Sequence, residues 1–152
     1  MDDAQLMRKA MEQAEFAEKY GEIPIGAVIT DAFGMVIAAA HNRTETDRSA
    51  TAHAELLAIS EACRKRGSRR LNDCTLYVTL EPCPMCAGAI ASARIGRVVF
   101  GAKDPRAGAY GSLIDLSGLP LESRPLVTSG ILAEECLAPI RRFFMNRRKN
   151  PN

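Results

Sequence analysis

Two short patterns in the sequence combine residue types that bind transition metals. The first is His53-Ala54-Glu55, and the second is Pro82-Cys83-Pro84-Met85-Cys86. Cysteines three apart in a first helical turn share one face, where the positive end of the helix dipole stabilises their thiolates. Two thiolates and one imidazole suit Zn²⁺, and three protein ligands leave the fourth tetrahedral position open, as in catalytic zinc sites. We therefore predict that His53, Cys83 and Cys86 bind one zinc ion.

Glu55 adds a candidate proton carrier to this set. Positions two apart on a regular helix point about 200° apart. His53 and Glu55 can therefore share a site only if that site lies off the N-terminus of their helix. The helix dipole stabilises a carboxylate there as well. Since a carboxylate beside a metal-activated water can take its proton and hand it on, Glu55 is the predicted general acid–base.

A Cys-x-x-Cys pair also has other interpretations. It could be a redox pair, or it could belong to a structural zinc site, which would need a fourth ligand. Neither His41 nor any other cysteine lies at a ligand-like spacing from the pair. We interpret the remaining thiols as buried small apolar residues, namely Cys63, Cys74 and Cys136.

Length and composition narrow the class of protein. The chain has 152 residues, of which 47% are hydrophobic and 25% charged, a mixture typical of one globular domain and unlike a disordered chain. No apolar run approaches the ~20 residues that cross a bilayer, and the first residues lack the layout of a secretory signal. We expect a cytoplasmic protein without membrane association, whose five cysteines form no disulfide framework.

The net charge of +2 conceals an asymmetry. Residues 141–152 contain five basic and no acidic side chains, so the other 140 residues, with 15 basic and 18 acidic side chains, carry a formal charge of −3. A basic end on a nearly neutral body indicates a polyanionic partner. Residues 64–70 form a second basic cluster.

Hydrophobic periodicity predicts the elements that position these residues. Apolar spacing and small-residue content predict helices over 3–20, 52–66, 85–93 and 131–149. Short apolar runs predict strands over 25–29, 35–39, 74–80, 97–101 and 126–128, the first two joined as a hairpin. Residues 103–123 are rich in Gly, Pro and polar groups and predict a long functional loop. The order of elements indicates a single α/β domain over residues 1–152, with helices on both faces of a sheet.

The two motifs resemble those of the zinc-dependent nucleobase deaminases, whose signature is H-x-E followed by P-C-x-x-C. The likeness extends to the bacterial tRNA-specific adenosine deaminases and covers nearly the whole chain. It is carried by residues 22–28, 41–43, 51–55, 76–89, 94–104, 108–112 and 130–136. The loop around Asp104 and the ending Phe143-Phe144…Arg147-Arg148 are more particular to the tRNA enzymes.

This resemblance implies a fold and a reaction. The fold is a three-layer α-β-α sandwich with a five-stranded mixed sheet, assembled as a homodimer with one Zn²⁺ per subunit. The reaction is the hydrolytic conversion of the wobble adenosine of a tRNA anticodon to inosine. His53, Cys83 and Cys86 are implied as the ligands, and Glu55 as the residue that moves a proton to the purine ring nitrogen and then to the departing ammonia.

The resemblance also implies contacts to the tRNA anticodon stem-loop. Asn42 would hydrogen-bond the extruded nucleoside, Asp104 would contact the backbone or sugar near it, and RNA would also be touched by Phe144, Arg147 and Arg148. Loop bases flip with little unpairing, and RNA backbone charge is met by Arg or Lys. Simpler roles stay open: Asp104 as a turn residue, Phe143 and Phe144 as core, and the basic run as a solvated face.

Two other functions compete with this interpretation. One is deamination of a free base or nucleoside, of guanine or cytosine type, at the same metal site. The loop over 103–123 and the basic ending favour the tRNA enzyme, because a small-molecule enzyme needs neither. The other is a zinc-stabilised RNA-binding module without catalysis. Glu55 argues against it, because such a module has no use for a carboxylate at that position.

Overall fold

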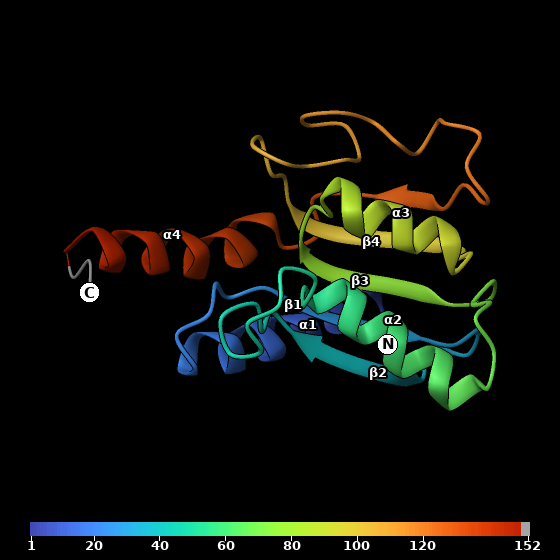
Figure 1. The fold of residues 1–152 in the computed structure, drawn as a ribbon, viewed down its shortest axis with the longest axis horizontal. Helices are drawn as coiled ribbons and strands as arrows, with labels where there is room; N and C mark the ends of the chain where they lie inside the picture. The colour runs from blue at the N-terminus through green and yellow to red at the C-terminus, as the bar shows by residue number, and fades with distance from the viewer. Residues whose placement is uncertain (150–152) are drawn as a thin grey trace.

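A mixed five-stranded sheet forms the middle layer of the computed structural model, which describes residues 1–149 (Figure 1). Its strands are β1 (Gly26–Thr30), β2 (Val36–His41), β3 (Thr75–Leu80), β4 (Arg97–Ala102) and β5 (Leu126–Thr128). They lie in the order β2-β1-β3-β4-β5. Strand β1 is antiparallel to both neighbours, whereas β3, β4 and β5 are mutually parallel. The predicted strands and the β1–β2 hairpin are confirmed.

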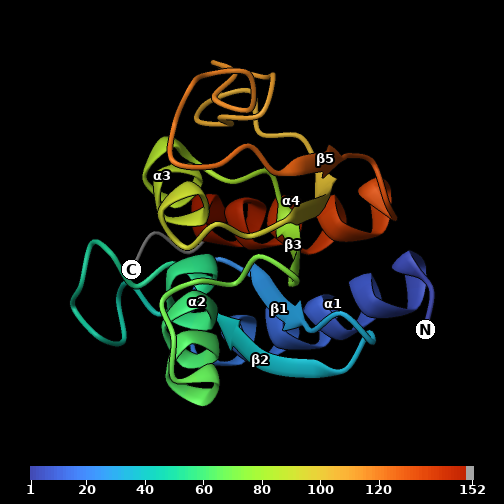
Figure 2. The same ribbon diagram turned by 90° about the vertical axis from the view of Figure 1, so that its right-hand side faces the viewer.

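Helices cover both faces of this sheet (Figure 2). Helices α2 (Ala54–Arg66) and α3 (Pro84–Ser92) pack on one face, and α1 (Asp3–Lys19) and α4 (Ala133–Lys149) on the other. Successive strand residues alternate between the two layers. Ile29, Leu76 and Val98 join the cluster under α2 and α3, while Val28, Tyr77 and Val99 join the cluster under α1 and α4. The expected three-layer α-β-α sandwich is confirmed.

The first helix is held closely against the sheet. At Gly26 a Cβ atom would lie 2.1 Å from the carbonyl oxygen of Ala10, so only glycine fits where α1 crosses β1. Asp2 and Gln5 cap the helix start reciprocally, each side chain accepting from the other's backbone N–H at 2.8 Å. This fixed helix leads directly into Glu22 and Ile23, which lie beside the candidate site.

The parallel strands create the edge at which that site lies. Helix α3 connects β3 to β4, and the carboxyl ends of the two strands meet at one edge of the sheet. In open α/β sheets ligands bind in the crevice outside these carboxyl ends. Cys83 follows β3 at this edge, and Asp104 follows β4.

Some predicted details differ from the structure. Helix α2 begins at Ala54 rather than Ala52, because His53 has extended backbone (φ −75°, ψ 148°) and acts as the N-cap. Helix α4 begins at Ala133 and continues through Pro139. Cys74 and Cys136 are buried as predicted, whereas Cys63 is only half-buried, although it packs against the core cluster under α2 and α3.

The domain organisation stays a prediction. All strands over residues 1–149 belong to one sheet, which agrees with one domain, and residues 150–152 of the predicted domain lie outside the described part. Within the same residues, no helix combines the length and apolarity that crossing a membrane requires.

Candidate metal centre and substrate pocket

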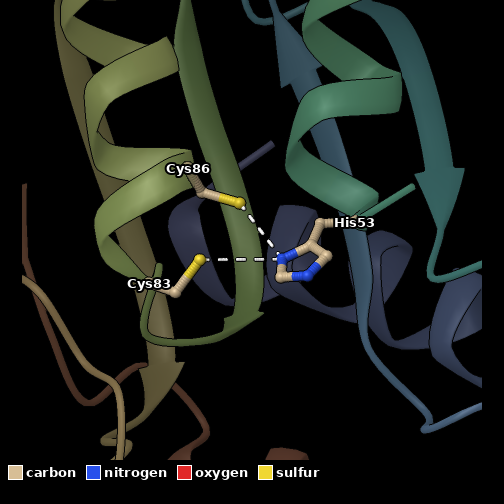
Figure 3. A group of neighbouring side chains, drawn as sticks. All are labelled: His53, Cys83 and Cys86. Atoms are coloured by element: carbon tan, nitrogen blue, oxygen red, sulfur yellow. Dashed lines mark hydrogen bonds between the residues drawn. The ribbon is translucent and has the colours of Figure 1, made fainter. Parts of the chain in front are cut away.

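Two helix starts bring three metal-binding side chains together. His53 is the N-cap of α2, Cys83 is the N-cap of α3, and Cys86 lies in the first turn of α3. Their ligand atoms all lie within 4.8 Å of one another. Figure 3 shows both sulfurs directed at the His53 ring across the gap between the two helices. We call His53, Cys83 and Cys86 the metal cluster.

The spacing of the metal cluster fits a zinc ion. The His53 Nδ1 atom lies 3.7 Å from the Cys83 Sγ and 3.4 Å from the Cys86 Sγ. Tetrahedral zinc with its usual Zn–N and Zn–S bond lengths separates such atoms by about 3.6 Å. The nitrogen–sulfur donor set also suits zinc. Within residues 1–149, these are the only three residues of metal-binding type that form such a cluster.

The side chains of the metal cluster shift one another's pKa values. A hydrogen bond from the Cys86 thiol lowers the pKa of Cys83 to about 4, although burial opposes this effect. The pKa of Cys86 is raised by that same bond, by burial and by the nearby Glu55 carboxylate. The hydrogen bond with Cys83 also raises the pKa of His53. Cys83 therefore ionises readily, as a zinc-binding thiol must.

Glu55 lies in the first turn of α2 and is 4% exposed. Burial raises the pKa of its carboxyl, although the neighbouring His53 partly offsets this. A raised pKa suits a group that must accept a proton and return it near neutral pH. The structure thus brings Glu55 to the metal cluster off the helix N-terminus, as the spacing of the motif predicted.

A cavity of about 180 Å³ opens beside the metal cluster. We call it the inner pocket. Apolar side chains supply much of its wall, and several polar groups converge on it, which is the usual composition of a small-molecule site. It is lined by Ile23, Ile25, Asn42, Thr44, His53, Ala54, Glu55, Leu80, Glu81, Cys83, Asp104 and Ala107.

One wall of the inner pocket is the segment that follows β2. Asn42 is 5% exposed; its backbone N–H donates to the Ile25 carbonyl at 3.0 Å, and its side-chain oxygen accepts from the Thr44 N–H at 3.3 Å. Glu22 braces the next turn, since its carboxylate accepts from the N–H groups of Glu45 (3.2 Å) and Thr46 (2.7 Å). Burial opposes the charge on Glu22, but these bonds hold its pKa below the usual value.

The opposite wall is the segment that follows β4. Asp104 lines the inner pocket, and its Oδ1 accepts from the N–H groups of Arg106 (3.0 Å) and Ala107 (3.3 Å). The turn role considered from the sequence is therefore present. It coexists with a position on the pocket wall, so the two interpretations of Asp104 do not exclude each other.

A larger groove of about 1020 Å³ adjoins the inner pocket and shares Ile23, Ile25, Leu80, Asp104 and Ala107 with it. We call it the outer groove. Its far side is α4, whose second half projects past the sheet toward the C-terminus (Figure 1). Its remaining lining residues are Lys103, Pro105, Arg106, Leu137, Ile140, Arg141, Phe144, Met145, Arg147 and Arg148.

The aromatic pair of α4 does not belong to the core. Phe144 is 38% exposed in the outer groove, so the alternative that it is a core residue is wrong. Phe143 is half-buried and packs edge-to-face on Phe144, with ring centroids 5.5 Å apart. The Arg147 guanidinium lies 5.5 Å from the centroid of the Phe143 ring, a cation–π contact that orders the helix end.

The second basic cluster lies elsewhere. Residues 64–70 occupy the C-terminal end of α2 and the turn after it, whereas His53 precedes the first residue of that helix. At 1.5 Å per residue, the helix places them about 20 Å apart. The cluster over 64–70 therefore does not contribute to the inner pocket or the outer groove.

Two buried acids were given no role from the sequence. Glu22 and Glu81 are 1% and 2% exposed, and each binds the backbone of one pocket wall. The sequence does indicate that the two acids are buried, because Glu22 directly precedes an apolar run that leads into a strand and Glu81 directly follows a strand. Acids in such positions are expected to be paired.

Comparison with known proteins assigns a family to this arrangement. Residues 1–102 match the family described as the cytidine and deoxycytidylate deaminase zinc-binding region. The chain is 48% identical over 148 residues to a tRNA-specific adenosine deaminase of Bacillus subtilis, covering 97% of this chain and 91% of the relative.

Solved structures give the same result for the fold. A structure from a study of A-to-I editing by tRNA:A34 deaminases superposes with a TM-score of 0.84 and 43% identity, covering 89% of this chain and 98% of that one. A guanine deaminase from Nitrosomonas europaea superposes with a TM-score of 0.78 and 27% identity, covering 92% and 83% of the two chains.

Proposed function

Because this chain belongs to the cytidine and deoxycytidylate deaminase zinc-binding family, we propose that it deaminates adenosine to inosine at the wobble position of a tRNA anticodon. The reaction is hydrolytic and releases ammonia. One observation carries the proposal: Glu55 and two members of the metal cluster, His53 and Cys83, line an inner pocket that opens into a groove lined by basic and aromatic side chains.

The outer groove favours RNA over a free base. A free guanine or cytosine would occupy only a small pocket, and it would not use Phe144, Arg147 or Arg148. RNA needs positive charge along its backbone and aromatic or guanidinium planes for its unstacked bases. The chain is also more similar to the tRNA:A34 deaminase structure than to the guanine deaminase, at 43% against 27% identity.

In the proposed site, His53, Cys83 and Cys86 hold one zinc ion. A zinc ion with three such ligands would act as a Lewis acid and lower the pKa of a water molecule toward neutrality. Glu55 takes a proton from the attacking water and delivers it to the purine ring nitrogen. It then carries a proton to the amino group that leaves the ring carbon as ammonia.

The remaining residues bind the substrate in this proposal. The Asn42 side chain, held by Thr44, hydrogen-bonds the nucleoside extruded into the inner pocket. Asp104 contacts the backbone or sugar beside it, where the two cavities meet. Phe144, Arg147 and Arg148 contact the anticodon loop along the outer groove. The flipped base then lies in the inner pocket while the rest of the loop stays outside.

We also propose a homodimer. Support comes from the outer surface of α2 and α3, where Leu56, Leu57 and Ala89 line a hollow and Met85 is 38% exposed. Exposed apolar groups of this kind often mark a surface at which two protein chains associate. Light scattering at micromolar concentration tests this: a mass near twice 16.5 kDa is expected, and a monomer would contradict it.

A cytoplasmic location belongs to the same proposal. The substrate is a tRNA, and the cysteines over residues 1–149 are free thiols, which suits a reducing compartment.

The experiment that tests the function measures ammonia release from matched substrates. We expect the purified zinc-loaded protein to release ammonia from an anticodon stem-loop with a wobble adenosine. A stem-loop carrying guanosine at that position is the matched control and should release none. Release from free guanine, cytosine or cytidine, without release from the stem-loop, would instead support the small-molecule deaminase.

A further inference from the structure

Glu81 occupies the position between β3 and the first zinc-binding cysteine. It follows Leu80, the last residue of β3, and precedes Pro82-Cys83. Its side chain is 2% exposed, although a carboxylate is costly to bury without partners. The proposed reaction gives Glu81 no task, since Glu55 already carries the protons. Its burial therefore needs another explanation.

The partners of the Glu81 carboxylate all come from the segment that follows β4. One oxygen accepts from the Asp104 N–H at 3.0 Å and from the Ser112 hydroxyl, and the other accepts from the Tyr110 N–H at 2.9 Å and the Ser112 N–H at 3.2 Å. All of these donors converge on one side chain that is itself buried, so Glu81 is a fixed point for residues 104–112.

Gly108 shows how closely this segment surrounds the carboxylate. A Cβ atom at Gly108 would lie 2.3–2.5 Å from the carboxylate carbon and oxygens of Glu81. Glu81 could not yield easily, because it is buried and held by several hydrogen bonds. The Ala109 N–H also donates to the Pro82 carbonyl at 2.8 Å, so the same segment is bound next to Cys83.

The segment held in this way forms one wall of both cavities. Asp104 and Ala107 line the inner pocket and the outer groove, and Pro105 and Arg106 line the outer groove. We propose that Glu81 is a positioning residue that sets this wall for the anticodon loop and thereby determines affinity for the RNA. This proposal rests on the proposed function, because it takes the anticodon loop as the ligand of the wall.

The test compares zinc-loaded wild type with Glu81→Gln, Gly108→Ala and the control Glu122→Gln. Glutamine keeps the size of the side chain but turns one acceptor into a donor that faces backbone N–H groups. Gly108→Ala disturbs the contact between Gly108 and the Glu81 carboxylate from the other side. Glu122 is the control position because it is an exposed acid of the same long loop. For each protein we would measure zinc content, melting temperature, stem-loop binding by fluorescence anisotropy, and kcat and KM.

We expect Glu81→Gln and Gly108→Ala to retain zinc and to raise both Kd and KM about tenfold, which corresponds to the loss of one or two hydrogen bonds between the displaced wall and the RNA. The kcat value should change about threefold or less, since the metal cluster and Glu55 are intact. Glu122→Gln should match wild type. If Glu81→Gln does not fold, Ser112→Ala removes one donor only, and a smaller rise in Kd is expected from it.

Three outcomes would overturn the proposal. The first is wild-type binding and kinetics in Glu81→Gln. The second is a fall in the kcat of Glu81→Gln that matches its loss of zinc while KM stays unchanged. That result is expected if Glu81 only supports the structure beside Cys83. The third is unchanged Kd in Ser112→Ala when Glu81→Gln does not fold. A wild type that binds the stem-loop without deaminating it would instead refute the proposed function, and the comparison of Kd values would still test Glu81.

Discussion

The metal cluster and the outer groove hold their side chains by different means. His53, Cys83 and Cys86 sit at the starts of two helices that are packed on the sheet, and Glu55 beside them is buried. In the outer groove, Phe144, Arg147 and Arg148 project from a part of α4 that has passed the sheet. The cluster is thus fixed by the core, whereas this end of α4 is held by surface contacts, namely the Arg142–Glu18 ion pair to α1 and the contact of Arg147 with the Phe143 ring.

This difference assigns separate tasks to the two regions. Chemistry on a base needs atoms held to a fraction of an ångström, and only groups locked by packing provide that. Binding of an RNA backbone relies on charge that tolerates movement, because the interaction is long-ranged and involves counterion release. Substitutions in the metal cluster should therefore abolish the reaction, and substitutions in the outer groove should weaken binding in a salt-dependent way.

The largest effect is expected from Cys83→Ala. The substitution leaves two zinc ligands and removes the thiol whose pKa is lowered, so metal analysis should find little bound zinc and assays should find no deamination. Cys63→Ala is the matched control, because Cys63 is half-buried outside the metal cluster. Unchanged zinc content in Cys83→Ala would refute its role as a ligand.

Glu55→Ala should separate chemistry from metal binding. We expect kcat to fall about 10²–10⁴-fold, the usual contribution of a general acid–base. Zinc content and the melting temperature should stay near the wild-type values, since the ligands are untouched. Glu55→Gln, which preserves the size of the side chain, should lose as much activity. Near wild-type activity in either variant would contradict the proposed role.

A double substitution tests the outer groove. Replacing Arg147 and Arg148 by alanine should weaken stem-loop binding about tenfold and reduce the slope of log K against log salt by about 1–2. The same change at Arg69 and Arg70 removes equal charge at the far end of α2. A smaller effect is expected there. If the first pair changed neither affinity nor slope, the end of α4 would be only a solvated face.

Zinc binding should also release protons. Without metal, the pKa of Cys86 is raised chiefly by its hydrogen bond to Cys83, and that of His53 is raised as well. Both must lose their protons to bind zinc, so affinity should rise with pH, with about one to two protons released per zinc near pH 7. Calorimetry in two buffers of different ionisation enthalpy measures this number. No proton release would contradict the electrostatics described for the cluster.

The sequence predicted the metal cluster better than its surroundings, for a physical reason. His53, Glu55, Cys83 and Cys86 belong to two local motifs whose geometry follows from helix starts, and their residue types together predicted one shared zinc site. The strands and helices followed from periodicity in the same way. The differences at the start of α2 and at Cys63 reflect capping geometry and the depth of packing, which periodicity does not encode.

The loops around the site could not be predicted to the same extent. Glu22 and Glu81 bind backbone groups 23 to 31 residues away in the chain. Their positions beside apolar runs indicate that they are buried and paired, but not which segment each of them binds. The exposure of Phe144 depends on how far α4 extends past the sheet, which the helical pattern leaves open. What sequence reasoning missed is therefore the support of the two pocket walls.

The most direct test of the central claim is sequencing of an anticodon stem-loop after incubation with the purified zinc-loaded protein. Inosine pairs as guanosine during reverse transcription, so the wobble adenosine should be read as guanosine while other adenosines remain unchanged. The same stem-loop incubated with Glu55→Ala should keep its adenosine. A stem-loop that stays unmodified with the wild-type protein would contradict the account.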